Sequence, residues 1–153
     1  MTPANGLVFG KDEQVAAWVA RRLPHVGDAG FGPCRAIAIV SGTRPLGAIV
    51  YHDFQPLHGT CQISMATVSP LWAKRQTIRD LLAVPFLQYD CRKVWTCIPS
   101  DNTRAIRFNE NIGMTCEGKL RHHFGPKRAA WIFGMMRHEY DARWGVQADK
   151  EAA

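Results

Sequence analysis

The sequence predicts an α+β fold in which helices flank one mixed, mostly antiparallel sheet, and three observations carry this expectation. Patterns typical of helices and strands follow one another in the order helix, three strands, helix, strand, helix, two strands. Short links join the first three strands, which favours an antiparallel meander. A long helix connects the third strand to the fourth, which indicates a parallel crossover. The 153 residues, 46% of them hydrophobic, are expected to form a single domain over 1–153.

The N-terminal half combines one amphipathic helix with three strands. Hydrophobic residues recur at helical spacing from Val15 to Leu23, and we expect Asp12 to cap this helix and Pro24 to end it. Three glycines and a proline make residues 25–34 a loop, which we expect to border a substrate cleft. The β-rich runs that follow predict strands over residues 36–40, 46–54 and 61–68.

The C-terminal half supplies the crossover. A long helix is predicted over residues 76–89, and Pro85, which lacks an N–H group, is expected to kink it or end it early. The compact apolar run 94–98 predicts a strand that is buried on both faces. The remaining expected elements are a third helix from Asp101 or Asn102 to Gly113, strands over 114–120 and 129–136, and a frayed tail over 145–153.

Composition and charge narrow the classes of function. No apolar run approaches the roughly 20 residues that span a bilayer, and no targeting signal is visible, so we expect a cytoplasmic protein with no membrane partner. The five cysteines are scattered, which favours reduced, mostly buried thiols over a disulfide framework or a zinc ribbon. The formal charge of +6 is compatible with an anionic partner, either cofactor phosphates or nucleic acid, and equally with a solvated basic surface.

Four segments together resemble the GCN5-related N-acetyltransferase (GNAT) superfamily. They are Val68–Trp72 before the long helix, Asn102–Ala105 after the next strand, Ile112–Arg121, and Phe133–Met135. The likeness covers roughly residues 36–140 and follows the element order given above. The Glu-Gly-x-Leu-Arg segment within it looks closest to the branch that acetylates ribosomal-protein N-termini and antibiotics, and to small phage-borne members.

The resemblance implies an enzyme that transfers an acetyl or other acyl group from acyl-coenzyme A to a primary amine by direct attack. In that superfamily the turn before the long helix holds the cofactor pyrophosphate on backbone N–H groups. The family pattern there is Gln/Arg-x-x-Gly-x-Gly/Ala, and both glycines are absent from this chain, while basic residues bring positive charge to the same turn. The implied cofactor-binding residues are Val68, Ala73, Lys74, Arg75, Gln76, Thr77, Ile78 and Asn102.

Two asparagines of the third helix have counterparts in the family. Asn102 matches an asparagine that contacts the pantetheine arm, although a plain helix N-cap would look the same. In many relatives a tyrosine seven residues later protonates the leaving thiolate, and that position here is Asn109. The usual general acid is therefore missing.

Aminolysis of a thioester needs an amine stripped of its proton and backbone N–H groups that stabilise an oxyanion. We consider His52, Asp53 and Glu117 as catalytic candidates: His52 as base or relay beside Asp53, and Glu117 as an attraction for a cationic amine. A surface histidine–aspartate pair and a solvated ion pair are the alternatives. Strand alternation places His52 on the opposite face from Tyr51 and Asp53. The spacing of these residues matches no metal-ligand signature, so no metal is expected.

Two further functions stay open. The +6 charge favours a phage-type protein that modifies or binds nucleic acid on the same fold, with an affinity that falls steeply with salt. The glycine-poor turn fits a non-catalytic module that binds a protein partner. For the acyltransferase, the expected partners are acyl-coenzyme A, an amine acceptor and, as a candidate assembly, a second copy of the chain.

Overall fold

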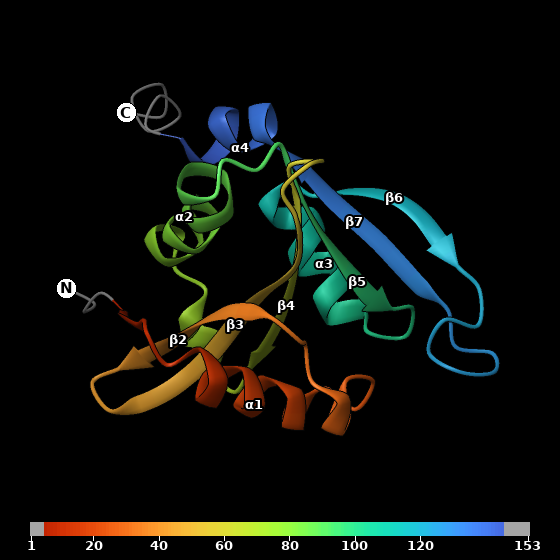
Figure 1. Cartoon of the computed structure of the whole chain (residues 1–153), viewed down its shortest axis with the longest axis horizontal. Coiled ribbons are helices and arrows are strands. Elements are labelled where there is room, and N and C mark those ends of the chain that lie inside the picture. Colours follow the sequence, from red (N-terminus) through yellow and green to blue (C-terminus); the bar gives the residue numbers. More distant parts are fainter. Residues whose placement is uncertain (1–4, 146–153) are drawn as a thin grey trace.

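The computed structural model describes residues 5–145, and over this range its centre is a seven-stranded sheet in the order β1-β2-β3-β4-β5-β7-β6 (Figure 1). The strands are β1 (Gly6–Val8), β2 (Cys34–Ser41), β3 (Arg44–Gln55), β4 (Thr60–Thr67), β5 (Lys93–Pro99), β6 (Thr115–Leu120) and β7 (Ala130–Met136). The helices are α1 (Asp12–Arg22), α2 (Arg75–Ala83), α3 (Thr103–Ile112) and α4 (Arg137–Trp144), with short turns η1 (Gly27–Ala29), η2 (Pro70–Trp72) and η3 (Val84–Gln88). The predicted mixed sheet flanked by helices is confirmed, because only β4 and β5 pair in parallel.

The two faces of the sheet carry separate hydrophobic cores. On one face, α1 packs Val15 and Val19 against Val50 and other small side chains of β2 to β4. On the other face, Leu81 of α2 and Ile112 of α3 belong to a larger cluster that covers the sheet from β2 to β7. Figure 1 shows α1 and α2 on opposite sides of the strands. Where the strands are paired, the sheet therefore separates the side chains of the two cores.

The sheet is interrupted within the predicted crossover β4–α2–β5. β4 and β5 are paired through Thr60 and Lys93, Cys61 and Val94, and Gln62 and Trp95. Beyond these pairs β4 continues to Thr67 on β3, and β5 continues to Pro99 on β7. Each strand keeps its other neighbour while the two separate from one another. Backbone groups of β4 that face the separation are thus left without a β5 partner among the described residues.

The N-terminal cap of α1 differs from the expectation. The N-cap residue is Lys11, which makes no capping bond with its side chain, and Asp12 lies in the first turn. The Asp12 carboxylate instead accepts a hydrogen bond from the Ala36 N–H at 2.9 Å and pairs with Arg35 at 3.2 Å. The expected cap is therefore wrong, because a tertiary contact to β2 takes up the carboxylate.

The long helix is interrupted where Pro85 lies. α2 ends at Ala83 and is followed by the π-helical turn η3, in which Pro85 is buried. A proline cannot donate the N–H that a continuous α-helix requires, so the prediction of a kink or an early end is confirmed as an early end of the α-helix. The expectation that β5 is buried on both faces is wrong. Val94 and Ile98 are buried, whereas Trp95 and Cys97 on the opposite face are half-exposed.

Two elements lie outside the expected order. β1 is a three-residue strand that pairs antiparallel with β2. α4 is held by the Trp144 indole N–H, which donates to the Ile112 carbonyl at 2.8 Å. Of the tail expected to fray over 145–153, residues 146–153 lie outside the described part of the chain.

The cysteines only partly match the expectation of mostly buried thiols. All five are free, and Cys61 and Cys91 are buried, while the others are half-exposed or exposed. Across residues 5–145, none of the helices has the length and apolar character needed to cross a membrane.

Candidate functional site

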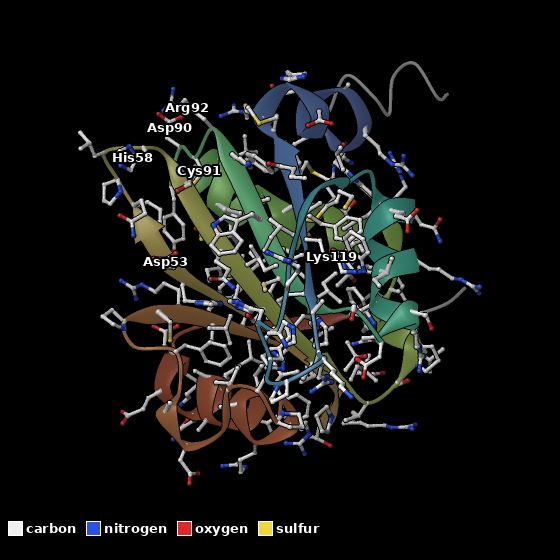
Figure 2. All side chains as sticks on the ribbon, turned by 90° about the vertical axis from the view of Figure 1, so that its right-hand side faces the viewer. Asp53, His58, Asp90, Cys91, Arg92 and Lys119 are labelled. Carbon is white, nitrogen blue, oxygen red and sulfur yellow. The ribbon has the colours of Figure 1, made fainter. Side chains whose placement is uncertain are left out.

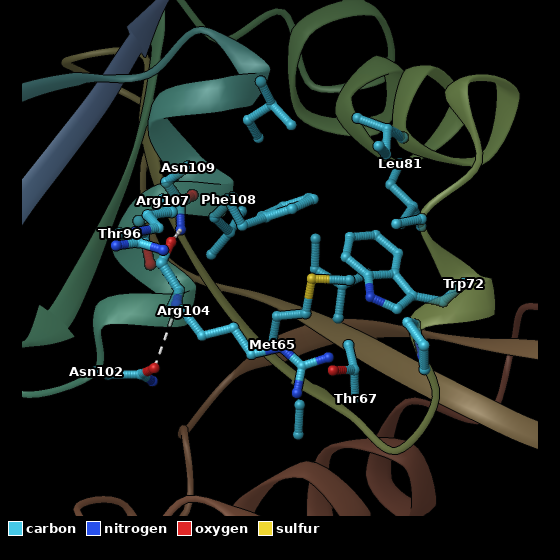
Figure 3. Close-up of a pocket in the computed structure, with 18 of the residues that line it drawn as sticks. Met65, Thr67, Trp72, Leu81, Thr96, Asn102, Arg104, Arg107, Phe108 and Asn109 are labelled. Atoms are coloured by element: carbon cyan, nitrogen blue, oxygen red, sulfur yellow. Dashed lines mark hydrogen bonds between the residues drawn. The ribbon is translucent and has the colours of Figure 1, made fainter.

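A cavity of about 800 Å³ lies where β4 and β5 separate, on the face covered by α2 and α3. Met65 and Thr67 of β4 form one part of its wall, and Leu81 of α2 forms another. Figure 3 shows Trp72 and Leu81 facing Phe108 of α3. The Trp72 and Phe108 ring centroids lie 4.9 Å apart, so the aromatic pair holds the turn before α2 against α3. We call this space the donor cavity, after the acyl donor that the sequence resemblance leads us to expect.

A second cavity of about 270 Å³ lies on the opposite face of the same two strands. Ser64 of β4 and Cys97 of β5 line it, whereas their neighbours Met65 and Thr96 line the donor cavity. Successive side chains of a strand point to opposite faces, so the two cavities lie back to back across the sheet. The loop after α1, through residues such as Phe31, and Phe124 of the β6–β7 loop complete the walls. We call this space the acceptor cavity, after the expected amine acceptor, and the loop expected to border a cleft does line it.

The structure brings part of the expected cofactor set together. Val68, Ala73, Ile78 and Asn102 line the donor cavity. Lys74, Arg75, Gln76 and Thr77 form the adjoining start of α2 without being part of that lining. The side chain of Lys74 does not cap the helix. The first N–H groups of a helix have no acceptor within it, so this terminus has the character of an anion site next to the cavity.

The two missing glycines have different structural consequences. The Gln76 amide donates to the Asp80 carboxylate at 2.7 Å, which directs this side chain along the helix surface and out of the cavity. Ile78 is 8% exposed and belongs to both the hydrophobic core and the cavity wall. Gln76, at the first glycine position, therefore leaves the cavity open. Ile78, at the second, adds an apolar side chain to the cavity wall.

The basic residues of the turn hold α4. Arg75 donates to the Arg143 carbonyl at 3.0 Å, and its guanidinium lies 4.8 Å from the centroid of the Trp144 ring. Arg79 donates to the Trp144 carbonyl at 2.8 Å and to the Gly145 carbonyl at 2.9 Å. Positive charge at the C-terminal end of a helix is favourable. Part of the positive charge expected to serve a phosphate thus stabilises α4.

Sequence reasoning missed two arginines of α3. Arg104 and Arg107 line the donor cavity and are exposed, and among residues 5–145 no hydrogen bond or ion pair of either side chain is recorded. Figure 3 shows Arg104 reaching from α3 across the cavity toward Met65 and Thr67. The available signal was their spacing of three residues just after Asn102, which places both on one side of a helix.

Asn102 and Asn109 each make a hydrogen bond to the backbone of α3 and also line the donor cavity. The Asn102 side chain accepts from the Ala105 N–H at 3.2 Å, as an N-cap does, and the same residue lines the donor cavity. The Asn109 amide also lines it and donates to the Ala105 carbonyl at 2.8 Å. Both interpretations of Asn102 are thus compatible with its position.

His52 lines the acceptor cavity. A ring nitrogen lies 2.8 Å from the Ser64 hydroxyl oxygen, and the ring centroid is 4.8 Å from that of Phe31. Burial lowers the pKa of His52, while the negative charge of Asp53 acts in the opposite direction. The imidazole is therefore neutral at neutral pH and able to take up a proton.

Asp53 and Glu117 are not brought into either cavity. Asp53 follows a break in the β3–β4 register, has a positive φ of 48° and accepts from the Gln55 amide at 2.9 Å. Figure 2 shows it on the side of the sheet toward His58, away from Lys119 of β6. Glu117 pairs with Lys93, and its carboxylate occupies the space that a Cβ at Gly134 would need. Over residues 5–145 no three histidine, cysteine or acidic side chains are grouped so that they could hold a metal ion.

No protein-family model matches the sequence, and no curated protein matches it either. Solved structures do match. A putative acetyltransferase superposes with a TM-score of 0.66 at 23% identity, over 79% of this chain and 66% of that one. Mutant forms of a spermidine/spermine N-acetyltransferase from Vibrio cholerae give 0.71 at 14% identity, over 92% and 99%. A spermidine N-acetyltransferase from the same organism, in complex with CoA and spermine, gives 0.63 at 16% identity, over 71% and 69%.

These likenesses show the fold. The described chain, with its mixed sheet and flanking helices, shares the fold of these acetyltransferase structures. It spans about two thirds of the length of the first of them, 66%.

Proposed function

We propose that this protein is an acetyl-coenzyme A-dependent N-acetyltransferase of the GNAT type, which acetylates a primary amine by direct attack. One observation carries the proposal: two cavities lie back to back where β4 and β5 separate. An acyl donor on one face and an amine on the other would meet through this separation without sharing a cavity. Direct transfer requires both reactants to be held at bonding distance at once, and this arrangement would allow it.

The residues of the donor cavity fit the coenzyme. When bound, acetyl-coenzyme A would supply the activated acetyl thioester. A volume of about 800 Å³ is within the range of cofactor sites, and its apolar wall, which includes Leu81 and Phe108, suits an alkyl arm. The start of α2, with Lys74 and Arg75, would bind the pyrophosphate, and Arg104 would add a charge-assisted contact. Asn102 would contact the pantetheine arm from the edge of the cavity.

His52 is the proposed general base. Its neutral ring lies in the acceptor cavity and would accept the proton of the incoming ammonium group. Ser64 orients the ring through the 2.8 Å contact. Backbone N–H groups of β4 that face the separation would stabilise negative charge on the carbonyl oxygen. Asp53 would act on His52 only through its negative charge, which raises the pKa of the imidazole. Glu117 is paired with Lys93 and would meet an acceptor only outside both cavities.

The leaving thiolate needs a stabilising group, and Asn109 cannot provide a proton at neutral pH. Arg107 lines the same cavity and carries a permanent positive charge. We assign it the stabilisation of this negative charge. The assignment to the branch that acetylates ribosomal-protein N-termini and antibiotics rests on the segment from Glu117 to Arg121, which covers the end of the edge strand β6.

The first test is calorimetric titration of the protein with acetyl-coenzyme A and with free coenzyme A. Arg104→Glu should weaken binding about tenfold or more, because it replaces an attraction to phosphate by a repulsion. Arg44→Glu makes the same charge change at an exposed position outside both cavities and should leave affinity unchanged. Absence of saturable coenzyme binding by the unmodified protein would contradict the proposal.

A second candidate function is nucleic-acid binding. Basic residues gather on β6 and the loop after it, namely Lys119, Arg121, Lys127 and Arg128. Duplex DNA titrated at two salt concentrations distinguishes this function, because counterion release makes affinity fall steeply with salt. A non-catalytic protein-binding module would bind neither the coenzyme nor DNA.

A further inference from the structure

We infer that the acceptor is a compact primary amine whose only positive charge is the reacting amine, carried on an aromatic or apolar body, and that polyamines are poor substrates. The inference rests on the proposed function and narrows its substrate class. It comes from the walls of the acceptor cavity, which are aromatic and contain no carboxylate among the described residues.

Rings from three separate segments line this cavity. His25 of the loop after α1 lies 4.6 Å, centroid to centroid, from Phe124 of the β6–β7 loop. Phe31 lies 4.8 Å from His52, and His123 lies 4.9 Å from Phe124. With a volume of about 270 Å³, the space suits a body of one small ring. Aromatic walls bind such a body by stacking and by excluding water.

The polar groups of the cavity carry no permanent negative charge. Gln62 contributes an amide, Ser64 a hydroxyl and Cys97 a thiol, and burial raises the pKa of that thiol, which keeps it protonated. No carboxylate in the described lining would neutralise a second ammonium group, and a buried charge without a counter-charge is costly.

The surrounding charges act in the same direction. Burial, Arg128 and His123 all lower the pKa of His25, so a positive potential reaches the cavity from the β6–β7 loop. The nearby acidic groups lie outside the lining: Asp101 pairs with Arg128 at 3.3 Å, Asp53 is exposed on β3, and Asp28 is exposed on η1. The described lining therefore offers no carboxylate to a second cation, and the charge of Arg128 near His25 disfavours it.

The test compares two acceptors at saturating acetyl-coenzyme A, 2-phenylethylamine and spermidine, with acetylated products identified by mass spectrometry. We expect kcat/KM to be at least about tenfold higher for 2-phenylethylamine, because stacking favours its ring and the missing counter-charge disfavours the second cation. Phe124→Ala, on a loop, should raise KM for 2-phenylethylamine without changing the affinity for acetyl-coenzyme A, which binds on the other face.

A charge change at the rim provides the specificity control. Ala29 is exposed and lines the acceptor cavity, so Ala29→Asp should raise the spermidine to 2-phenylethylamine ratio of kcat/KM about fivefold. Ala17→Asp makes the same change at an exposed position of α1 outside both cavities and should leave the ratio unchanged.

The outcomes separate the inference from its premise. If acetyl-coenzyme A binds and spermidine is the better acceptor, or neither amine is acetylated, the inference is overturned while the donor site stands. If acetyl-coenzyme A does not bind, the proposed function fails and the inference fails with it.

Discussion

The chemistry of His52 depends on neighbours that are distant in the sequence. Ser64 lies on the adjacent strand, and Phe31 comes from the loop after α1. Their packing buries the imidazole and lowers its pKa, so the ring is neutral where an isolated histidine is partly charged. The sequence identified the residue type. Only packing decided that it lies in a cavity with a lowered pKa, which is the basis for proposing it as the base.

Replacing His52 by glutamine should lower kcat about 100-fold, because glutamine cannot take up a proton. Affinity for acetyl-coenzyme A should not change, since His52 lies on the other face of the sheet. The lowered pKa predicts that activity of the unmodified protein persists below pH about 6.5, where a histidine of ordinary pKa would lose it. Steady-state kinetics from pH 5 to pH 8 check this expectation.

His58→Gln is the matched control, because His58 is exposed and lines neither cavity. A His52→Gln enzyme with kcat within twofold of the unmodified protein would remove His52 from the reaction.

Among the elements, α4 illustrates how a short helix depends on its neighbours. It has eight residues, too few to be stable alone, and no clear apolar stripe runs along them. Tertiary hydrogen bonds hold its end: the Trp144 indole donates to the Ile112 carbonyl, and Arg75 and Arg79 donate to its last carbonyls. α4 in turn fixes the start of α2, next to the donor cavity.

Replacing Trp144 by phenylalanine should destabilise the protein by about 1 to 3 kcal/mol, because the buried Ile112 carbonyl would lose its hydrogen-bond donor. Urea unfolding measures the effect. Trp18→Phe is the control, since Trp18 is half-buried on α1 and its indole N–H makes no recorded hydrogen bond within residues 5–145. Equal losses in both variants would show that the hydrogen bond contributes little.

For the whole molecule, buried titratable groups predict how stability depends on pH. His25 and His52 have lowered pKa values, so below pH about 6.5 the unfolded chain binds protons that the folded protein does not. The free energy of unfolding should fall as pH drops through this range. Burial raises the pKa of Cys61 to about 12 and that of Tyr51 well above its ordinary value. Stability should therefore also fall as pH rises above the ordinary cysteine value of 9.0.

Thermal unfolding at pH 5.5, 7.5 and 10.5 checks both the acidic and the alkaline loss of stability. We expect the highest unfolding midpoint at pH 7.5. In the double variant His25→Gln, His52→Gln, the midpoint should fall less between pH 7.5 and pH 5.5, while the fall at alkaline pH should stay the same. If this variant loses as much stability at acidic pH as the unmodified protein, other titratable groups cause the loss.

Local patterns determined most of the elements of this fold. Helical spacing, β-rich runs and the missing N–H of Pro85 each act within a few residues, so the core elements, the crossover and the kink could be predicted. The patterns failed where tertiary contacts overrule local ones. Asp12 bonds to β2 instead of capping α1, and β1 and α4 are too short to leave a pattern.

By itself, the sequence determined the fold class and the positions of candidate residues along the chain. Only the tertiary structure decided where these side chains lie: His52 enters a cavity, Glu117 pairs with Lys93, and Arg104 of α3 lines the other cavity. The physical reason is that β4 and β5 separate after three residue pairs. Strand alternation then divides their side chains between two opposite cavities, and this division depends on the register of strands that lie far apart in the sequence.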